Sequence, residues 1–179
     1  MSQLSEFLLL ANYNQLMNQR QFEASLELSD KQLNQDCGAF FKSVLGTLNH
    51  ILVGDIIWLK RFSDHPSSKT SLAYIIEIPK PTSLNSLLHT DFHMLWKERQ
   101  KIDLILINWI EKLDKSSIED CISYQNMAGE TFSKSLSSLI QHLFLHQVHH
   151  RGQVTTLLSQ FGVKFGETDL IEFIPDCSN

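Results

Sequence analysis

The chain contains 179 residues, of which 42% are hydrophobic and 20% are charged, proportions typical of one soluble globular domain spanning residues 1–179. They exclude disordered and collagen-like proteins. The 15 Lys and Arg residues and the 20 Asp and Glu residues give a net charge of -5, and no basic run exceeds two residues. The chain therefore lacks a basic surface that would bind nucleic acids or anionic membranes, and we expect neither as a partner.

The start of the chain and its cysteines indicate a cytoplasmic protein. No basic segment precedes the apolar run at residues 7–11, which is too short for a signal peptide, and no apolar stretch is long enough to span a membrane. Cys37, Cys121 and Cys177 are widely spaced and odd in number, as expected in a reducing compartment. We interpret each cysteine as a small buried or surface hydrophobic residue rather than a catalytic thiol.

Apolar residues recur with helical periodicity in four long segments, which comprise residues 4–28, 38–62, 90–113 and 133–161. The apolar stripe of the second segment contains Phe41, Val44, Leu45, Leu48, Leu52, Ile56 and Leu59. The third segment has a side-chain N-cap at Thr90 or Asp91. The fourth ends at Gly162, which readily adopts the left-handed C-cap conformation.

Prolines divide the middle of the chain. Residues 63–89 contain Pro66, Pro79 and Pro81 and cannot form one helix, so we predict a long crossover between the second and third helices. The sequence thus predicts an all-α fold, a four-helix bundle that is not simply up-down-up-down. Residues 118–132 are expected to form a small hairpin or an irregular loop before the last helix.

Four of the eight histidines lie close together in the fourth segment. His142, His146 and His150 are spaced four residues apart, so they point to similar sides of a helix and could hold one metal ion. On a helical wheel, His146 and His150 lie within or beside the stripe that faces the core, whereas His142 and His149 lie toward its flank. The alternative is a hydrogen-bonded pair of core histidines, because this spacing alone is weak evidence for a metal site.

A third ligand would come from another helix, and His50 is the candidate. Gly46 and Gly54 flank it four residues away on either side, which leaves room for a close helix or a ligand, and ordinary close packing is the alternative. His50 lies roughly opposite the main stripe of its helix, but Val53 and Ile57 form a second apolar face on its side. A dimer interface would explain a helix that is buried on two sides.

The segment from His146 to Gln153 reads H-Q-V-H-H-R-G-Q. It resembles the H-x-x-H-H-R-G-Q signature of the DinB/YfiT-like superfamily of metal-dependent enzymes, which is unrelated to the similarly named DNA polymerase. The helix around His50 is similar to the helix that carries the first histidine of that family. The similarity in helix order and spacing covers essentially the whole chain, whereas the motifs are confined to these two helices.

This resemblance implies a four-helix bundle, often a homodimer, in which three histidines bind a divalent metal ion. On this sequence the ligands would be His50, His146 and His150, while His142 and His149 become candidates for positions behind the ligands or on the surface. Three imidazoles leave one or more positions for water or substrate, as in catalytic sites. Zinc, nickel or iron would suit neutral imidazoles.

Some relatives in the superfamily are transferases that use low-molecular-weight thiols, so the resemblance implies a metal-dependent transferase with such a thiol as cosubstrate and a small-molecule electrophile. Asp55 and Gln153 are candidates for orienting ligands or moving protons, and Arg151 for binding a carboxylate. Structural roles are the alternative, because Asp55 and Arg151 point away from the neighbouring ligands on the wheel.

Two other functions stay open. A metal-dependent hydrolase would need a general base near the ion, and no Glu stands within the histidine ladder. A non-catalytic stress protein that binds a metal ion or a small ligand is the second alternative.

Overall fold

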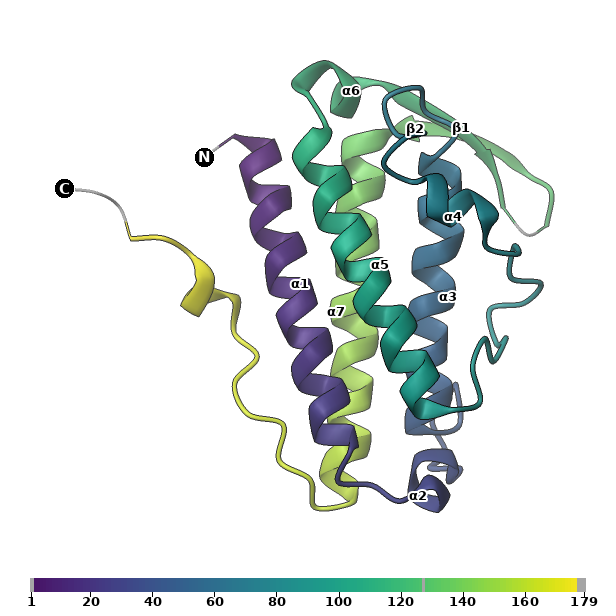
Figure 1. Cartoon of the computed structure of the whole chain (residues 1–179), viewed down its shortest axis with the longest axis vertical. Helices are drawn as coiled ribbons and strands as arrows, with labels where there is room; N and C mark the ends of the chain where they lie inside the picture. The colour runs from purple at the N-terminus through teal and green to yellow at the C-terminus, as the bar shows by residue number, and fades with distance from the viewer. Residues whose placement is uncertain (1, 127, 177–179) are drawn as a thin grey trace.

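Four long helices form the body of the protein, and the computed structural model describes residues 2–126 and 128–176. The long helices are α1 (Gln3–Ser25), α3 (Val44–Phe62), α5 (Phe92–Lys112) and α7 (Leu136–Gln160). In Figure 1, α1 and α7 run downward and α3 and α5 run upward, so α3 and α5 are parallel. The predicted all-α bundle with a long crossover is confirmed, and its order is not up-down-up-down.

Short elements connect the long helices. They are α2 (Asp30–Asn34), α4 (Ala73–Glu77) in the crossover, α6 (Lys115–Glu119), the antiparallel strands β1 (Cys121–Gln125) and β2 (Thr131–Ser135), and the 3-10 turn η1 (Leu170–Phe173). The hairpin is one of the two forms expected for residues 118–132. Among the described residues, every helix is too short or too polar to span a lipid bilayer. Cys177 lies outside the described residues.

Polar caps fix where two of the long helices begin. Ser43 accepts a hydrogen bond from the backbone N–H of Gly46, so α3 begins at residue 44 and not at the predicted residue 38. The residues before it form a turn in which Lys42 has a φ of 71°. Asp91, one of the two predicted caps, begins α5, because its carboxylate accepts from the N–H of Met94 at 2.8 Å.

The other long helices also differ from prediction by a few residues. α1 ends at Ser25 rather than at residue 28, because Ser29 begins α2 with a capping box. α7 begins at residue 136 rather than at 133, because residues 131–135 pair with β1. Gly162 follows α7 with a φ of 79°, as predicted for a left-handed C-cap.

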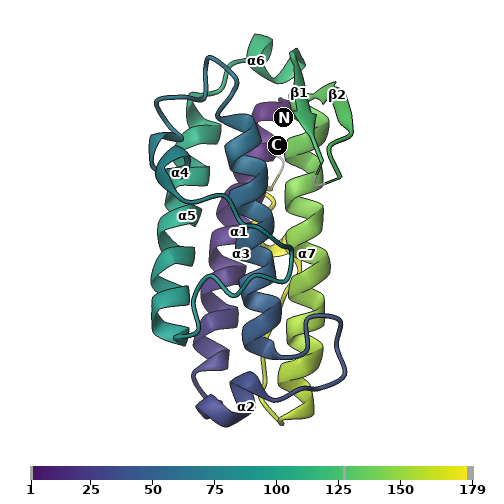
Figure 2. The same ribbon diagram turned by 90° about the vertical axis from the view of Figure 1, so that its right-hand side faces the viewer.

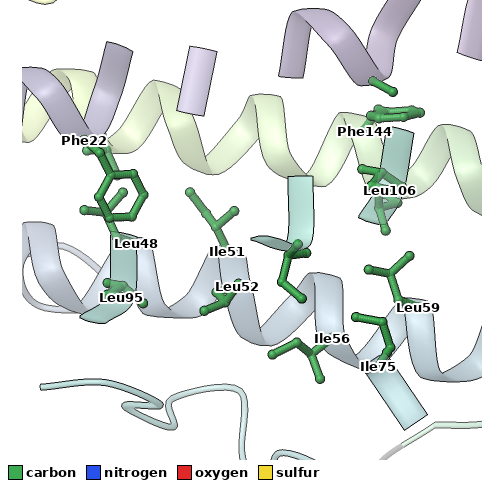
Figure 3. Close-up of a cluster of buried hydrophobic side chains, with 14 of the residues drawn as sticks. Phe22, Leu48, Ile51, Leu52, Ile56, Leu59, Ile75, Leu95, Leu106 and Phe144 are labelled. Carbon is green, nitrogen blue, oxygen red and sulfur yellow. The ribbon is translucent and has the colours of Figure 1, made fainter. Parts of the chain in front are cut away.

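Apolar side chains from the long helices fill the centre of the bundle (Figure 3). Leu48, Leu52 and Leu59 of α3 are at most 3% exposed, as the predicted stripe requires. Leu95 and Leu106 of α5 belong to the same cluster. Burial of each such side chain contributes roughly 1.5–3 kcal/mol, so this cluster is the main source of stability.

A layer of buried polar side chains crosses the core, and every long helix contributes to it. This polar layer contains Asn14 and Asn18 of α1, Asp55 of α3, Arg99 and Asp103 of α5, and Gln147 and Arg151 of α7. Arg99 donates a hydrogen bond to Asp55 and forms an ion pair with Asp103 at 2.8 Å. Gln147 donates to Asp55 at 2.7 Å and so joins α7 to α3. Because two arginines face two aspartates, the buried charges are balanced.

The crossover passes over α3 in Figure 2 and is joined to it by hydrogen bonds. The side-chain amide of Asn49 donates to the carbonyl of His89 at 3.0 Å, and its oxygen accepts from the N–H of His89 at 3.1 Å. Val53 and Ile57, on the second apolar side, are both buried. Burial of two sides of α3 is thus accounted for within one chain, and a homodimer stays a prediction.

Candidate metal centre

Three histidines from two helices meet at one point. His50 lies on α3, and His146 and His150 lie on successive turns of α7. The Nε2 atom of His50 is 3.2 Å from Nε2 of His146 and 3.1 Å from Nε2 of His150. One ring nitrogen from each of the three histidines lies within 4.8 Å of the others. A single ion between them could therefore contact all three.

The opposite ring nitrogens fix the orientation of two of these rings. Nδ1 of His50 donates to the carbonyl of Leu84 at 3.0 Å, and Nδ1 of His150 donates to Oε1 of Gln153 at 2.9 Å. Because both acceptors are oxygens, the proton of each neutral ring resides on Nδ1, and Nε2 carries a lone pair. Nδ1 of His146 is buried and has no hydrogen-bond partner among the described residues.

Burial keeps the three rings uncharged. It lowers the pKa of His50 to about 4 and the pKa of His146 to about 3, and it also lowers the pKa of His150. At neutral pH, the Nε2 lone pairs of His50 and His150 thus face each other at 3.1 Å, which is unfavourable unless a cation accepts them. Neutral imidazoles suit zinc, nickel and iron. The residues present therefore fit a divalent metal ion.

Two glycines and one aromatic ring shape the space around His50. Phe41, in the turn before α3, stacks on His50 with the ring centres 3.6 Å apart. A Cβ at Gly46 would lie 2.1 Å from the carbonyl oxygen of Phe41, so glycine permits this turn to close over the histidine. A Cβ at Gly54 would lie 2.6 Å from Cε1 of His146. Both glycines therefore make room for the histidine cluster.

We expect Gly54→Ala to weaken metal binding without unfolding the bundle. The added methyl group would press on the imidazole of His146 and displace its Nε2 atom, at a cost of about 1–3 kcal/mol. The matched control is Gly152→Ala in α7, because a Cβ there meets nothing within 4 Å. The control should gain roughly 0.5–1 kcal/mol and keep its metal affinity. Zinc calorimetry and thermal denaturation measure these effects, and equal zinc affinities would contradict the prediction.

A cavity of about 370 Å³ adjoins the histidine cluster. Its walls come from α3, α7, the crossover and the tip of the β1–β2 hairpin, and the lining includes His50, Ile57, Trp58, Arg61, Leu84, Asn126, His142 and His146. Asp and Glu are missing from the lining, as far as the described residues define it. The volume falls within the range of small-molecule sites, so the cluster faces a space that can hold a substrate.

Two of the other candidate residues lie in the polar layer. The carboxylate of Asp55 accepts from Arg99 and Gln147, and the guanidinium of Arg151 donates to Asn14. Neither Asp55 nor Arg151 lines the cavity beside the three histidines. The contacts of Asp55 and Arg151 therefore favour structural roles, the alternative given for both residues.

The remaining candidates lie nearer the cluster. Gln153 contacts two histidines at once, because its Oε1 accepts from His150 and its Nε2 donates to the exposed His149 at 3.1 Å. His142 lines the cavity, with its ring centre 6.1 Å from that of His146. Burial and the charge of Arg61 lower the pKa of His142.

Two partners of His50 were missed by the sequence analysis. Leu84 contributes a backbone carbonyl, which no side-chain pattern reveals. Phe41 was wrongly assigned to the core stripe of the second helix, because the helix begins after it and its ring is partly exposed. The available signal was Ser43, an N-cap residue that separates Phe41 from the helix.

The fold and the site define the class of this protein. It is a helical bundle in which three histidines from two long helices meet beside a small-molecule cavity. Comparison with known proteins gives the family. The chain belongs to the DinB family, whose family model matches residues 1–175. It is 26% identical over 161 residues to "Protein DinB" of Bacillus subtilis (strain 168), and the match covers 89% of this chain and 88% of that relative. No solved structure matches the chain.

Proposed function

We propose that His50, His146 and His150 bind one divalent metal ion, either zinc, nickel or iron, and that the protein is a metal-dependent transferase that uses a low-molecular-weight thiol. The observation that supports this proposal is the convergence of three Nε2 atoms beside a cavity. A site with only three protein ligands keeps a position for an exogenous ligand, which separates a catalytic site from a structural one.

When bound, the ion lowers the pKa of a thiol that shares the site, so that a sulfur nucleophile is available at neutral pH. The protein orients the imidazoles that would bind the ion. The carbonyl of Leu84 and the amide of Gln153 hold Nε2 of His50 and of His150 toward the common point. The ring of Phe41 covers His50 and excludes water from one side.

In the transfer step, a sulfur lone pair forms a bond to the electrophilic carbon, and the leaving group departs with the electron pair of its own bond. The thiol proton passes to a ring nitrogen of His142, which lines the same cavity, or to solvent. In the described part of the chain, the lining offers no carboxylate general base, so His142 is the candidate base of the cavity.

Thiol-dependent conjugation of monobromobimane tests the proposal. We expect protein loaded with zinc, nickel or iron to accelerate the reaction with at least one member of a panel of small thiols. Metal-free protein and His146→Ala should show only the uncatalysed rate. Uncatalysed rates across the whole panel at full metal occupancy would contradict the transferase and favour non-catalytic binding of metal or ligand. A homodimer and a cytoplasmic location stay predictions.

A further inference from the structure

Arg61, near the end of α3, is a partly buried cation with few partners. Its guanidinium lies 4.4 Å from the ring centre of Trp58 and 4.7 Å from that of Tyr124. It donates one hydrogen bond, to the carbonyl of Gln125 at 3.0 Å. In the described part of the chain, Arg61 forms no ion pair with a carboxylate within 4.0 Å. Because a guanidinium has five N–H donors, most of them stay available to a ligand.

The two buried arginines, Arg99 and Arg151, have side-chain partners that Arg61 lacks in the described part of the chain. Arg99 contacts two carboxylates, and Arg151 donates to side-chain oxygens of Asn14 and Gln147. Burial lowers the pKa of Arg61, because desolvation there is not offset by a neighbouring carboxylate. Unlike Arg99 and Arg151, Arg61 has one backbone carbonyl as its hydrogen-bond acceptor among the described residues.

Arg61 and His50 line the same cavity. His50, Gly54, Trp58 and Arg61 follow one another at spacings of four, four and three residues, so they share one face of α3. Eleven residues of helix separate the Cα atoms of His50 and Arg61 by about 16 Å. A molecule that contacts both ends must therefore be extended.

The surroundings of Arg61 add further positive charge. A neighbouring cavity of about 580 Å³ is lined by Arg61 together with Lys60 and Lys80. Asp64 is the one acidic residue in its described lining. The field around Arg61 thus favours an anion.

We propose that Arg61 binds the carboxylate of an extended small molecule whose other end reaches the three histidines. The apolar middle of this molecule would lie against Ile57, Trp58 and Leu84, which line the cavity between the two ends. A guanidinium binds a carboxylate through two parallel N–H bonds, and the aromatic faces hold it in place. The inference rests on the proposed function, since the other end carries the thiol or the electrophilic carbon.

The first test uses metal-free protein and so does not depend on metal chemistry. Octanoate and octan-1-ol are titrated separately by calorimetry, with tryptophan fluorescence as a second readout. We expect octanoate to bind about 10-fold more tightly than the alcohol, as is typical of hydrogen bonds to a charged group. Arg61→Gln should abolish this preference, and Arg61→Lys should retain part of it.

The matched control is Arg20→Gln, which removes the same charge from α1, where Arg20 donates to the carbonyl of Glu167. This variant should keep the preference for octanoate. Equal affinities for octanoate and octan-1-ol, or an unchanged preference in Arg61→Gln, would overturn the inference.

A second test identifies which reactant carries the carboxylate. Cobalt-substituted protein is titrated with 8-mercaptooctanoate and with 8-mercaptooctan-1-ol, and the sulfur-to-cobalt charge-transfer band is recorded. If the thiol carries the carboxylate, the acid saturates the band at a lower concentration than the alcohol, and Arg61→Gln removes this advantage. If the electrophile carries it, both thiols saturate alike, and octanoate still binds beside 2-mercaptoethanol. Both results support the role of Arg61.

The two tests also separate the two proposals. A preference for octanoate that depends on Arg61, without any charge-transfer band, would contradict the thiol chemistry and leave the carboxylate site standing. A band without that preference would overturn the carboxylate site alone.

Discussion

Alanine at His50, His146 or His150 is expected to remove most of the bound metal. Each of these residues contributes one of the three converging Nε2 atoms. Changes behind the ligands of a metal site typically cost 10–100-fold in affinity, so we expect loss of a ligand to cost about 100-fold or more. Plasma mass spectrometry on untagged protein, purified without chelator, should find about one equivalent in the wild type and little in these variants.

The control is His65→Ala, because His65 lies away from the cluster and contacts Asp120 at 3.1 Å. This variant should retain its metal. Larger metal loss in His142→Ala than in His50→Ala would show that the ligand set is wrong. Wild-type protein that stays empty after reconstitution with each ion would contradict the metal site itself.

Replacement of Arg99 by Met is expected to destabilise the protein by about 3–5 kcal/mol, because it leaves two buried carboxylates without their cation. Asp55 and Asp103 both contact Arg99, and all three side chains are at most 3% exposed. Methionine fills much of the same space, so loss of packing contributes little. Urea denaturation of wild type and variant at pH 8 measures the difference.

The destabilisation by Arg99→Met should decrease in acid. Burial raises the pKa of Asp103 to about 6 and also raises the pKa of Asp55. Removal of the Arg99 charge raises both pKa values further. The folded variant then binds protons more readily than its unfolded chain, so its relative stability rises as pH falls from these pKa values toward about 4. A pH-independent difference would contradict the assignment to charge.

The matched control for this prediction is Lys115→Met. Lys115 is exposed and pairs with Glu119 at 3.8 Å. Exposed pairs contribute about 0–1 kcal/mol, so the control should unfold almost as the wild type does. A loss of stability in Arg99→Met no larger than in the control would show that the polar layer does not stabilise the bundle.

Periodicity and turn chemistry predicted most of the fold. The four long helices, the crossover with its prolines and the caps at Asp91 and Gly162 all follow from local signals. The boundaries were less accurate where a competing local structure intervened. Residues 133–135, which read Ser-Lys-Ser, were included in the fourth predicted helix, but they pair with β1 instead.

The candidate site was only partly predictable. The spacing of His146 and His150 and the glycines beside His50 are visible in the sequence, but a helical wheel placed His50 opposite the core. The wheel assumes one buried face, whereas the crossover gives α3 a second one. Contacts such as that of Leu84 with His50 join residues 34 apart through a backbone atom, and no local pattern encodes them.

The polar layer also sets the axial register of the helices that carry the histidines. Gln147, which donates to Asp55 across the interface of α3 and α7, directly follows His146 in the chain. A slip of one helix past the other by one turn, about 5.4 Å, would break this hydrogen bond and separate the Nε2 atoms at the same time. Apolar neighbours, in contrast, can exchange one shape for another without defining a register. Sequences of this fold can therefore diverge widely in their apolar core while the alignment of the histidines is preserved.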